Sequence, residues 1–460
     1  MKISDYFKPL DQRNFDVWQL KSLFTTGMGV LTDGYDLSSI GIVLVFVLST
    51  FGITKKSPDY TLWQSLITGS ALIGSVIGAI IFGMLANKGR KKFYGVDVLL
   101  MTIGAVLEAF VTTPLELVLV RALLGLGVGA DYVLSPTIMA EHSNAKDRGK
   151  LLVLGVAMMS VFGFIIAAIL TLGLEVASVP QNLVWRIVLA AGAIPAASVI
   201  YLRRKIPETP RYLLRIKGDT QGFKNEVKLL AKTDVQVNES LKDINTFSEY
   251  FTKFGKIFVV AALLWFLQDI VAYSGTLFGP SLIAKSVGIN NGAIFSLIID
   301  LAFVIPGGIV AILTIDKVGR KPLLILGFIG VAVALLMFAT LKAVVPPTVA
   351  LVMYGMNDFF RKSGPSPITI GILGVEVAPT KVRTIVQAMA VAAGRSGAAL
   401  TSFVFPYFFH IYGESFTFGF LSGVTFIAAA LAYFGIPETK NKPLEVSSGE
   451  DVVSTKESVK

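Results

Sequence analysis

Twelve long apolar blocks dominate this 460-residue chain and decide what it can fold into. They fall near residues 20–50, 62–86, 93–112, 115–140, 149–174, 182–202, 257–284, 292–315, 322–341, 348–376, 384–409 and 414–436. A helix needs about 20 apolar residues to cross a bilayer. Only 16% of the residues are charged, whereas a soluble globular chain carries about 25%. The sequence therefore predicts an all-α membrane protein with twelve transmembrane helices and argues against a soluble enzyme.

Polar segments divide the chain into five regions. We expect an N-terminal segment at 1–19, a six-helix bundle at 20–202, a middle loop at 203–256, a second six-helix bundle at 257–436 and a tail at 437–460. The middle loop alternates apolar and charged residues between Tyr212 and Leu241, which predicts short amphipathic helices. The tail is polar, and we expect it to be disordered.

Basic residues in the connections predict the orientation. They are concentrated in every second connection, as Lys88, Arg90, Lys91, Lys92, Lys146, Arg148, Lys150, Arg203, Arg204, Lys205, Arg211, Arg215, Lys217, Lys317, Arg320, Lys321, Lys381 and Arg383. Lys and Arg accumulate in cytoplasmic loops. We therefore expect a multi-pass protein of the plasma membrane with both termini cytoplasmic. The net charge of +10 has the same explanation, so no nucleic-acid partner is expected.

The two halves of the chain repeat three short patterns at nearly one spacing. The patterns are residues 87–91 with 316–321, Glu141 and Arg148 with Glu376 and Arg383, and residues 207–210 with 437–439, at offsets of 230, 235 and 230 residues. Parallel six-helix halves of this kind build one large transporter fold, whose substrate site lies between the halves near mid-membrane. The sequence predicts two pseudo-symmetric bundles with a site between them.

Several motifs resemble those of known transporters. They are the Gly-Arg-Lys loops at 89–91 and 319–321, PETPRYL at 207–213, PETK at 437–440, TDGYDL at 32–37, GADYVLS at 129–135 with Arg-Gly at 148–149, and WFLQDIVAY at 265–273. The paired loops resemble the major facilitator superfamily over essentially the whole chain. The two Pro-Glu-Thr motifs resemble its sugar-porter branch, and the remaining motifs resemble the phosphate:proton symporter family.

This resemblance implies a proton-coupled symporter that imports a small anion, with inorganic phosphate as the leading substrate, by alternating access. It implies no enzyme activity and no cofactor, because the proton is the coupling ion. Some positions depart from the family's pattern. Where the family has a glutamine, this chain has Met158–Ser160; Ser366 stands in place of an asparagine, Arg395 in place of a lysine and Asn87 in place of an aspartate. Arg361 and Lys362 stand where small or neutral residues are expected. These departures leave an organic or sugar-acid anion open as the substrate.

Acidic residues inside the apolar blocks need a reason, because a charge at the bilayer centre costs roughly 3 kcal/mol. The proton-coupling candidates are Asp33, Asp36, Asp97 and Asp131. Asp33 and Asp36 share one face of the first helix. By resemblance, Asp33 and Asp131 lie on the proton path and Asp97 lies near the cytoplasmic exit. A structural pair of Asp131 with Arg121 is the alternative.

Cationic and aromatic residues inside the apolar blocks favour binding of an anionic substrate. The substrate-binding candidates are Tyr132, Trp265, Asp269, Tyr273, Ser366, Arg395, Arg361 and Lys362. Trp265, Asp269 and Tyr273 are spaced by four residues and form one helical stripe, and arginine presents paired donors that match phosphate or carboxylate. Residues 364–367 (GPSP) must break the tenth helix. The alternative is that Arg361 and Lys362 only neutralise Asp358.

Charged residues at the cytoplasmic ends of the helices predict a gate. Its candidate members are Glu141, Arg148, Glu208, Arg320, Glu376 and Arg383. Ion pairs between the halves can bias a two-state equilibrium as they break and form again. Ordinary topology-setting charge is the alternative.

Three further expectations concern what the protein binds. The chain has no cysteine and only two histidines, His142 and His410, so no metal site is expected. We expect a monomer surrounded by lipid that handles a small-molecule substrate and protons. A sugar symporter of the same superfamily is the second hypothesis, and a non-transporting nutrient sensor on the same scaffold is the third.

Overall fold

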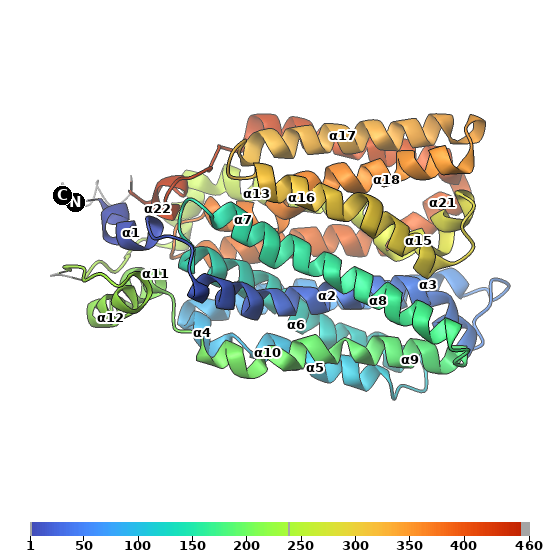
Figure 1. Cartoon of the computed structure of the whole chain (residues 1–460), viewed down its shortest axis with the longest axis horizontal. Helices are drawn as coiled ribbons and strands as arrows, with labels where there is room; N and C mark the ends of the chain where they lie inside the picture. The colour runs from blue at the N-terminus through green and yellow to red at the C-terminus, as the bar shows by residue number, and fades with distance from the viewer. Residues whose placement is uncertain (1, 238–239, 452–460) are drawn as a thin grey trace.

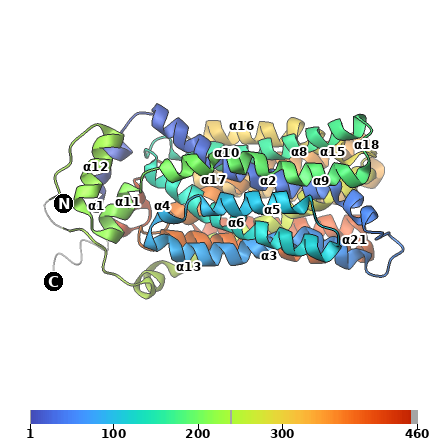
Figure 2. The ribbon, with the colours of Figure 1, turned by 90° about the horizontal axis from the view of Figure 1, so that it is seen from below.

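The computed structural model describes residues 2–237 and 240–451, and these residues form helices and connecting turns without any β-strand. The helices run along the long axis of the molecule in two bundles, one from each half of the chain (Figure 1). Both ends of the described chain and the short helices α1 (Ile3–Asp11), α11 (Pro210–Tyr212), α12 (Thr220–Ala231) and α22 (Leu444–Ser447) gather at one end (Figure 1, Figure 2). We call this the terminal end and the other the opposite end.

The first bundle contains six spanning segments, some of them built from two helices. Their bounds are α2 Val17–Thr50; α3 Tyr60–Leu85; α5 Val96–Glu108, preceded by α4 Arg90–Phe93; α6 Pro114–His142; α7 Arg148–Leu152, continued by α8 Met159–Val176; and α9 Gln181–Ala191, continued by α10 Ala193–Lys205. The Asp16 side chain accepts a hydrogen bond from the backbone N–H of Gln19 and so caps α2. A π-helical turn at 153–158 joins α7 to α8.

The second bundle repeats this plan with more interruptions. Its helices are α13 Phe247–Phe278 with α14 Ala284–Ser286, α15 Gly292–Ile299 with α16 Ile305–Thr314, α17 Arg320–Leu341, α18 Pro347–Ser363 with α19 Pro365–Pro367 and α20 Gly374–Glu376, and α21 Arg383–Gly435. Thr246 and Glu249 form a capping box at the start of α13. This helix therefore begins at Phe247, well before the apolar block expected from residue 257.

Twelve spanning segments result, as predicted. Nine helices in the described residues are long and apolar enough to cross a membrane. One of them, α21, holds two segments, because Gly413 reverses the chain with φ 79° and ψ 171°. The short α5 and the broken α18–α20 supply the other two. The predicted break is confirmed: α18 ends at Ser363, and Pro365 and Pro367 have no N–H to continue it.

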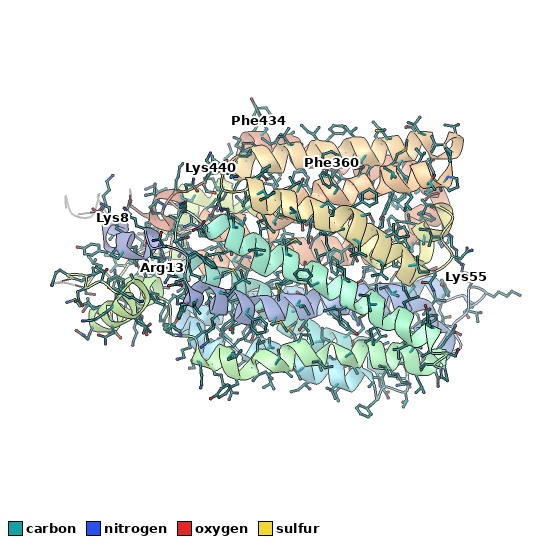
Figure 3. The ribbon with its side chains drawn as sticks, in the orientation of Figure 1. Lys8, Arg13, Lys55, Phe360, Phe434 and Lys440 are labelled. Carbon is teal, nitrogen blue, oxygen red and sulfur yellow. The ribbon has the colours of Figure 1, made fainter. Side chains whose placement is uncertain are left out.

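Large apolar side chains cover the sides of the bundles. Phe434 is 80% exposed on the flank of the second bundle, whereas Lys8, Arg13 and Lys440 lie at the terminal end and Lys55 at the opposite end (Figure 3). Water would penalise such an apolar flank, and lipid does not. The exposed surface therefore matches a membrane-spanning body with polar ends.

Glycines let α3 and α6 pack at backbone contact. A Cβ on Gly74 would lie 2.1 Å from the carbonyl oxygen of Ala122, and one on Gly125 would lie 2.1 Å from that of Ala71. No larger residue fits either position without moving a helix. Small residues at such interfaces are the usual means of close packing in membranes.

The terminal end carries a cap that was only partly expected from the sequence. Its helices are α1 Ile3–Asp11, α11 Pro210–Tyr212, α12 Thr220–Ala231 and α22 Leu444–Ser447. Arg211 binds Asp11 at 2.9 Å and Glu445 at 2.7 Å, and all three side chains are buried. The expectation of a disordered tail is therefore wrong for residues 437–451, because buried ion pairs hold them. Residues 452–460 lie outside the described residues.

Candidate functional site

One cavity lies between the two bundles, and we call it the central cavity. Eight of the site residues predicted from the sequence line it: Asp33, Tyr132, Asp269, Tyr273, Arg361, Lys362, Ser366 and Arg395. They come from α2 and α6 in the first bundle and from α13, α18, α19 and α21 in the second. Trp265 is buried beside the cavity, with its ring centroid 6.0 Å from that of Tyr132. Residues far apart in the chain thus meet at one polar site.

Arg395 lies between two acidic residues of this cavity. Its Nη2 lies 3.4 Å from Asp33 Oδ2, and its Nη1 lies 3.7 Å from Asp269 Oδ2. The guanidinium also lies 4.2 Å from the ring centroid of Tyr132 and donates a hydrogen bond to the Tyr273 hydroxyl. Arg395 is only 1% exposed. One cation therefore balances two carboxylates, one from each half of the chain.

Several polar atoms around Arg395 lack a hydrogen-bond partner among the described residues. They are Asp33 Oδ1, Asp269 Oδ2, Arg395 Nε and both amide atoms of Gln268. The hydroxyl of Tyr132 donates to the other oxygen of Asp33. Buried polar atoms are nearly always hydrogen-bonded in finished cores. This concentration of unsatisfied donors and acceptors is the pattern of a binding site.

Arg361 and Lys362 contact the cavity in different ways. Arg361 binds Asp358 one turn earlier on α18, as the alternative interpretation expected. Lys362 instead points across to α8, with its Nζ 3.4 Å from Ser160 Oγ. The two cations therefore do not share one carboxylate.

Three of the predicted proton-coupling residues lie away from the central cavity. Asp36 binds Arg121 at 3.1 Å, and the same arginine binds Glu108 at 2.9 Å. Asp36 therefore belongs to a buried ion-pair group inside the first bundle.

Asp97 and Asp131 form a second buried group. Both bind Nη1 of Arg203, at 2.5 and 2.6 Å. The proposed pair of Asp131 with Arg121 is wrong. Arg203 was missed because it opens a run of basic residues that was interpreted as loop charge, although α10 carries it back into the bundle.

Two matching ion-pair groups join the bundles at the terminal end. Glu141 binds Arg90 and Arg383, each at 2.7 Å. Glu376 binds Arg148 at 2.8 Å and Arg320 at 2.9 Å. The bonds from Arg383 and Arg148 cross between the halves of the chain.

The pseudo-symmetry of these groups extends to their hydroxyl donors. Thr209 donates to Glu141 and Thr439 donates to Glu376, each at 2.5 Å. Arg90 and the two threonines were not predicted, although their repeat at an offset of 230 residues was the available signal. Glu208 makes no crossing ion pair within the described chain, and it accepts instead from the backbone N–H of Lys91 at 3.2 Å.

Comparison with known proteins agrees with this geometry. The family model described as "Sugar (and other) transporter" matches residues 22–448. A probable inorganic phosphate transporter 1-10 from Oryza sativa subsp. japonica is 31% identical, over 96% of this chain and 91% of its own length. Low affinity inorganic phosphate transporter 4 from Lotus japonicus is 30% identical, over 97% and 94%.

Solved structures show the same fold. The major facilitator superfamily proton:xylose symporter XylE, bound to 6-bromo-6-deoxy-D-glucose, superposes with a TM-score of 0.82 at 23% identity, covering 94% of this chain and 99% of that one. The inward-open conformation of XylE from E. coli gives a TM-score of 0.69 at 24% identity, covering 95% and 99%.

The fold is the twelve-helix major facilitator fold, and the family match makes the chain a multi-pass membrane transporter. The chain belongs to the sugar (and other) transporter family.

Proposed function

We propose that this protein is a proton-coupled symporter that imports inorganic phosphate by alternating access. The observation that carries the proposal is the position of Arg395 between Asp33 and Asp269, which come from opposite halves of the chain. The names of the relatives, inorganic phosphate transporters, supply the substrate.

Charge balance links the anion to the proton. With both carboxylates ionised, an entering phosphate meets two negative groups around one arginine. Protonation of Asp33 or Asp269 removes that repulsion and frees donors of Arg395 for the anion. Because coupling is reciprocal, phosphate binding then favours proton binding to the same extent. We propose no cofactor besides the proton.

Contacts at both ends suit the occluded stage of such a cycle. Arg383 and Arg148 cross between the halves at the terminal end. At the opposite end, Asn291 donates to Glu175 across the halves at 2.9 Å. We propose that the terminal end, with its basic connections, faces the cytoplasm. We also propose that the protein acts as a monomer in the plasma membrane.

A proton-coupled sugar symporter is the second candidate. Gln268 favours it, because both of its amide atoms are unpartnered within the described residues and the residue lines the central cavity. An amide can bind sugar hydroxyls as well as phosphate oxygens. Arg395 distinguishes the candidates, because a neutral sugar gains little from a buried guanidinium.

Uptake into proteoliposomes tests the proposal. An inward proton gradient should drive accumulation of labelled phosphate, and a protonophore should abolish it. Asp269→Asn should remove the response to the gradient. Asp234→Asn is the matched control, because it neutralises an exposed carboxylate that pairs only with Lys228 in the described part of the chain. Xylose accumulation in place of phosphate would favour the sugar candidate, and binding without uptake would favour a sensor.

A further inference from the structure

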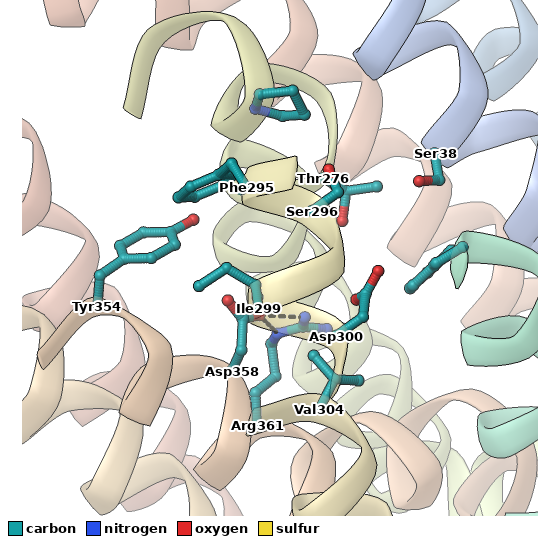
Figure 4. Close-up of a pocket in the computed structure, with 13 residues that line it drawn as sticks. Ser38, Thr276, Phe295, Ser296, Ile299, Asp300, Val304, Tyr354, Asp358 and Arg361 are labelled. Carbon is teal, nitrogen blue, oxygen red and sulfur yellow. Dashed lines mark hydrogen bonds and ion pairs between the residues drawn. The ribbon is translucent and has the colours of Figure 1, made fainter. Parts of the chain in front are cut away.

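A second buried cavity adjoins the central one. Asp300, Asp358 and Arg361 line it, and it shares Arg361, Phe164 and Thr276 with the central cavity. Figure 4 shows the Asp358–Arg361 pair and the Asp300 carboxyl group among the side chains around this space. The two cavities are therefore neighbours that share one cation.

The second cavity lies nearer the opposite end. Ser38 on α2 and Gly275 on α13 line it. Asp33 and Asp269, which precede them on the same helices, line the central cavity. Both helices run from the terminal end toward the opposite end (Figure 1). A substrate entering from the opposite end meets the second cavity first.

Asp300 is the unexplained group in this space. It is 6% exposed, yet its carboxyl group makes no hydrogen bond or ion pair within residues 2–237 and 240–451. Asp358, by contrast, is bonded to Arg361. A buried charge without a partner is costly. Asp300 also opens a π-helical turn, a feature that often occurs at functional sites.

The matching unpaired cation is Lys362, which lines the adjoining central cavity rather than the second one. Among the described residues its Nζ forms no ion pair, and it donates a hydrogen bond to Ser160 Oγ at 3.4 Å. The ammonium also lies 5.8 Å from the ring centroid of Phe164. The cluster around Asp300 thus contains two acids and two bases but only one ion pair.

Among the described residues, the charged or titratable groups near Asp300 all belong to one helix. They are Asp358, Arg361, Lys362 and Tyr354 on α18. The walls supplied by α2, α8 and α13 contain Ser38, Phe164 and Thr276, which carry no charge. With Asp300 ionised the cluster is neutral, and with Asp300 protonated it carries a charge of +1. Only the protonated form attracts an anion by its net charge.

We propose that this second cavity is an anion-loading site in which Arg361 binds a small oxyanion, Lys362 attracts it from the adjoining central cavity, and Asp300 takes up a proton as the anion enters. The inference rests on the proposed anion symport and adds a second proton-carrying residue to it. The proton comes from the solvent at the opposite end, and no covalent bond to the anion forms. The shared Arg361 then passes the anion to the central cavity.

Infrared difference spectroscopy of the protein in liposomes tests this role. Inorganic phosphate should produce a carbonyl band of a protonated carboxyl group, and one component of that band should disappear in Asp300→Asn. Asp300→Glu should keep the component at a shifted frequency. Asp234→Asn is the matched control, since it makes the same chemical change at an exposed carboxyl group that lines neither cavity. The number of protons taken up per phosphate should fall by one in Asp300→Asn only.

The outcomes separate this inference from the proposed function. If wild-type protein responds to phosphate and Asp300→Asn gives the same band and the same proton count, Asp300 carries no proton and the inference is wrong. If wild-type protein ignores phosphate, the proposed function fails. Spectra recorded without phosphate, as the difference between acid and alkaline pH, then still decide whether Asp300 takes up a proton. If Asp300→Asn keeps every carboxyl component of the wild-type spectrum, Asp300 does not titrate and the inference is wrong. Thermal melts confirm that each variant is folded.

Discussion

Arg148 Nε lies 2.8 Å from Glu376 Oε1, and the two residues belong to opposite halves of the chain. Glu376 also binds Arg320 within its own half. Both side chains of the crossing pair are fully buried. Removing one partner from a buried pair costs about 3–5 kcal/mol, because the other charge is left uncompensated. The crossing pair therefore holds the terminal end closed.

Glu376→Gln should open this end more often. Loss of the crossing pair should shift the balance between the closed and open states by about 3 kcal/mol. A shift of ~1.4 kcal/mol already changes the ratio of the two states tenfold. The chain has no cysteine, so Ser160→Cys provides a single thiol that reports access to the central cavity. We expect a membrane-impermeant thiol reagent to label it about tenfold faster, or more, in the Glu376→Gln background.

The control for this prediction is Asp5→Asn, which breaks an exposed ion pair with Lys8 in the same end of the molecule. Exposed pairs are worth little, so labelling should not change. Equal labelling in Glu376→Gln and in the control would mean that the crossing pair does not hold the closed state.

Arg395→Gln should weaken anion binding and spare a neutral ligand. Without the guanidinium, Asp33 and Asp269 face each other with no cation between them, and phosphate loses its charged donor. Charge-assisted hydrogen bonds are worth about 1.5–3 kcal/mol each, so phosphate affinity should fall by about tenfold to a hundredfold. Arg395→Lys keeps the charge and should recover part of the affinity.

Equilibrium binding of labelled phosphate and of xylose to the purified variants measures this effect. Loss of xylose binding with unchanged phosphate binding in Arg395→Gln would reverse the substrate assignment. The same assay on Ser198→Ala controls for general damage to the bundle, since that exposed side chain lines neither cavity.

Periodicity and repetition predicted more of the fold than of the site. Block lengths gave the twelve spans, and the offset between Glu141 and Glu376 gave the two matching halves. Two prolines gave the break after Ser363. These features could be predicted because each depends on neighbouring residues or on a repeat within the same chain, and both are visible in the sequence.

Partner choice inside the bundles could not be predicted in the same way. Helical spacing places Asp33 and Asp36 on one face, but it does not say that the first turns toward Arg395 and the second toward Arg121. Which helices are neighbours decides that, and the sequence of one chain does not encode it visibly. Asp300 was overlooked because it is a single charge within an apolar block.

Arg203→Gln should destabilise the protein rather than only impair transport. It leaves Asp97 and Asp131 buried with no shared cation, at an expected cost of about 3–5 kcal/mol. A fall in melting temperature of the detergent-solubilised protein measures this loss. Combining Arg203→Met with Asp97→Asn and Asp131→Asn should recover most of the stability, because a neutral buried group leaves no unpaired charge. Failure of the triple variant to recover would show that the arginine stabilises the fold by another route.

Docking of the tail should weaken in acid. Burial raises the pKa of the Glu450 carboxyl group, but Arg215, Arg383 and hydrogen bonds from Thr380 lower it by more, so the pKa lies below its ordinary value. A folded-state pKa below the unfolded value means that the contact contributes stability above the unfolded carboxyl pKa of about 4.3. That contribution is lost as the pH falls through the folded value.

Hydrogen–deuterium exchange of residues 444–451 measures this docking. Protection should be high near neutral pH and should fall in acid, after correction for the intrinsic exchange rate. Glu450→Gln should lower protection at neutral pH and flatten its pH dependence, because the amide does not titrate. Peptides from the middle of α17 in the same samples serve as the control, since they should stay protected throughout. A tail whose protection in Glu450→Gln still follows the wild-type pH profile would assign the acid sensitivity to another group.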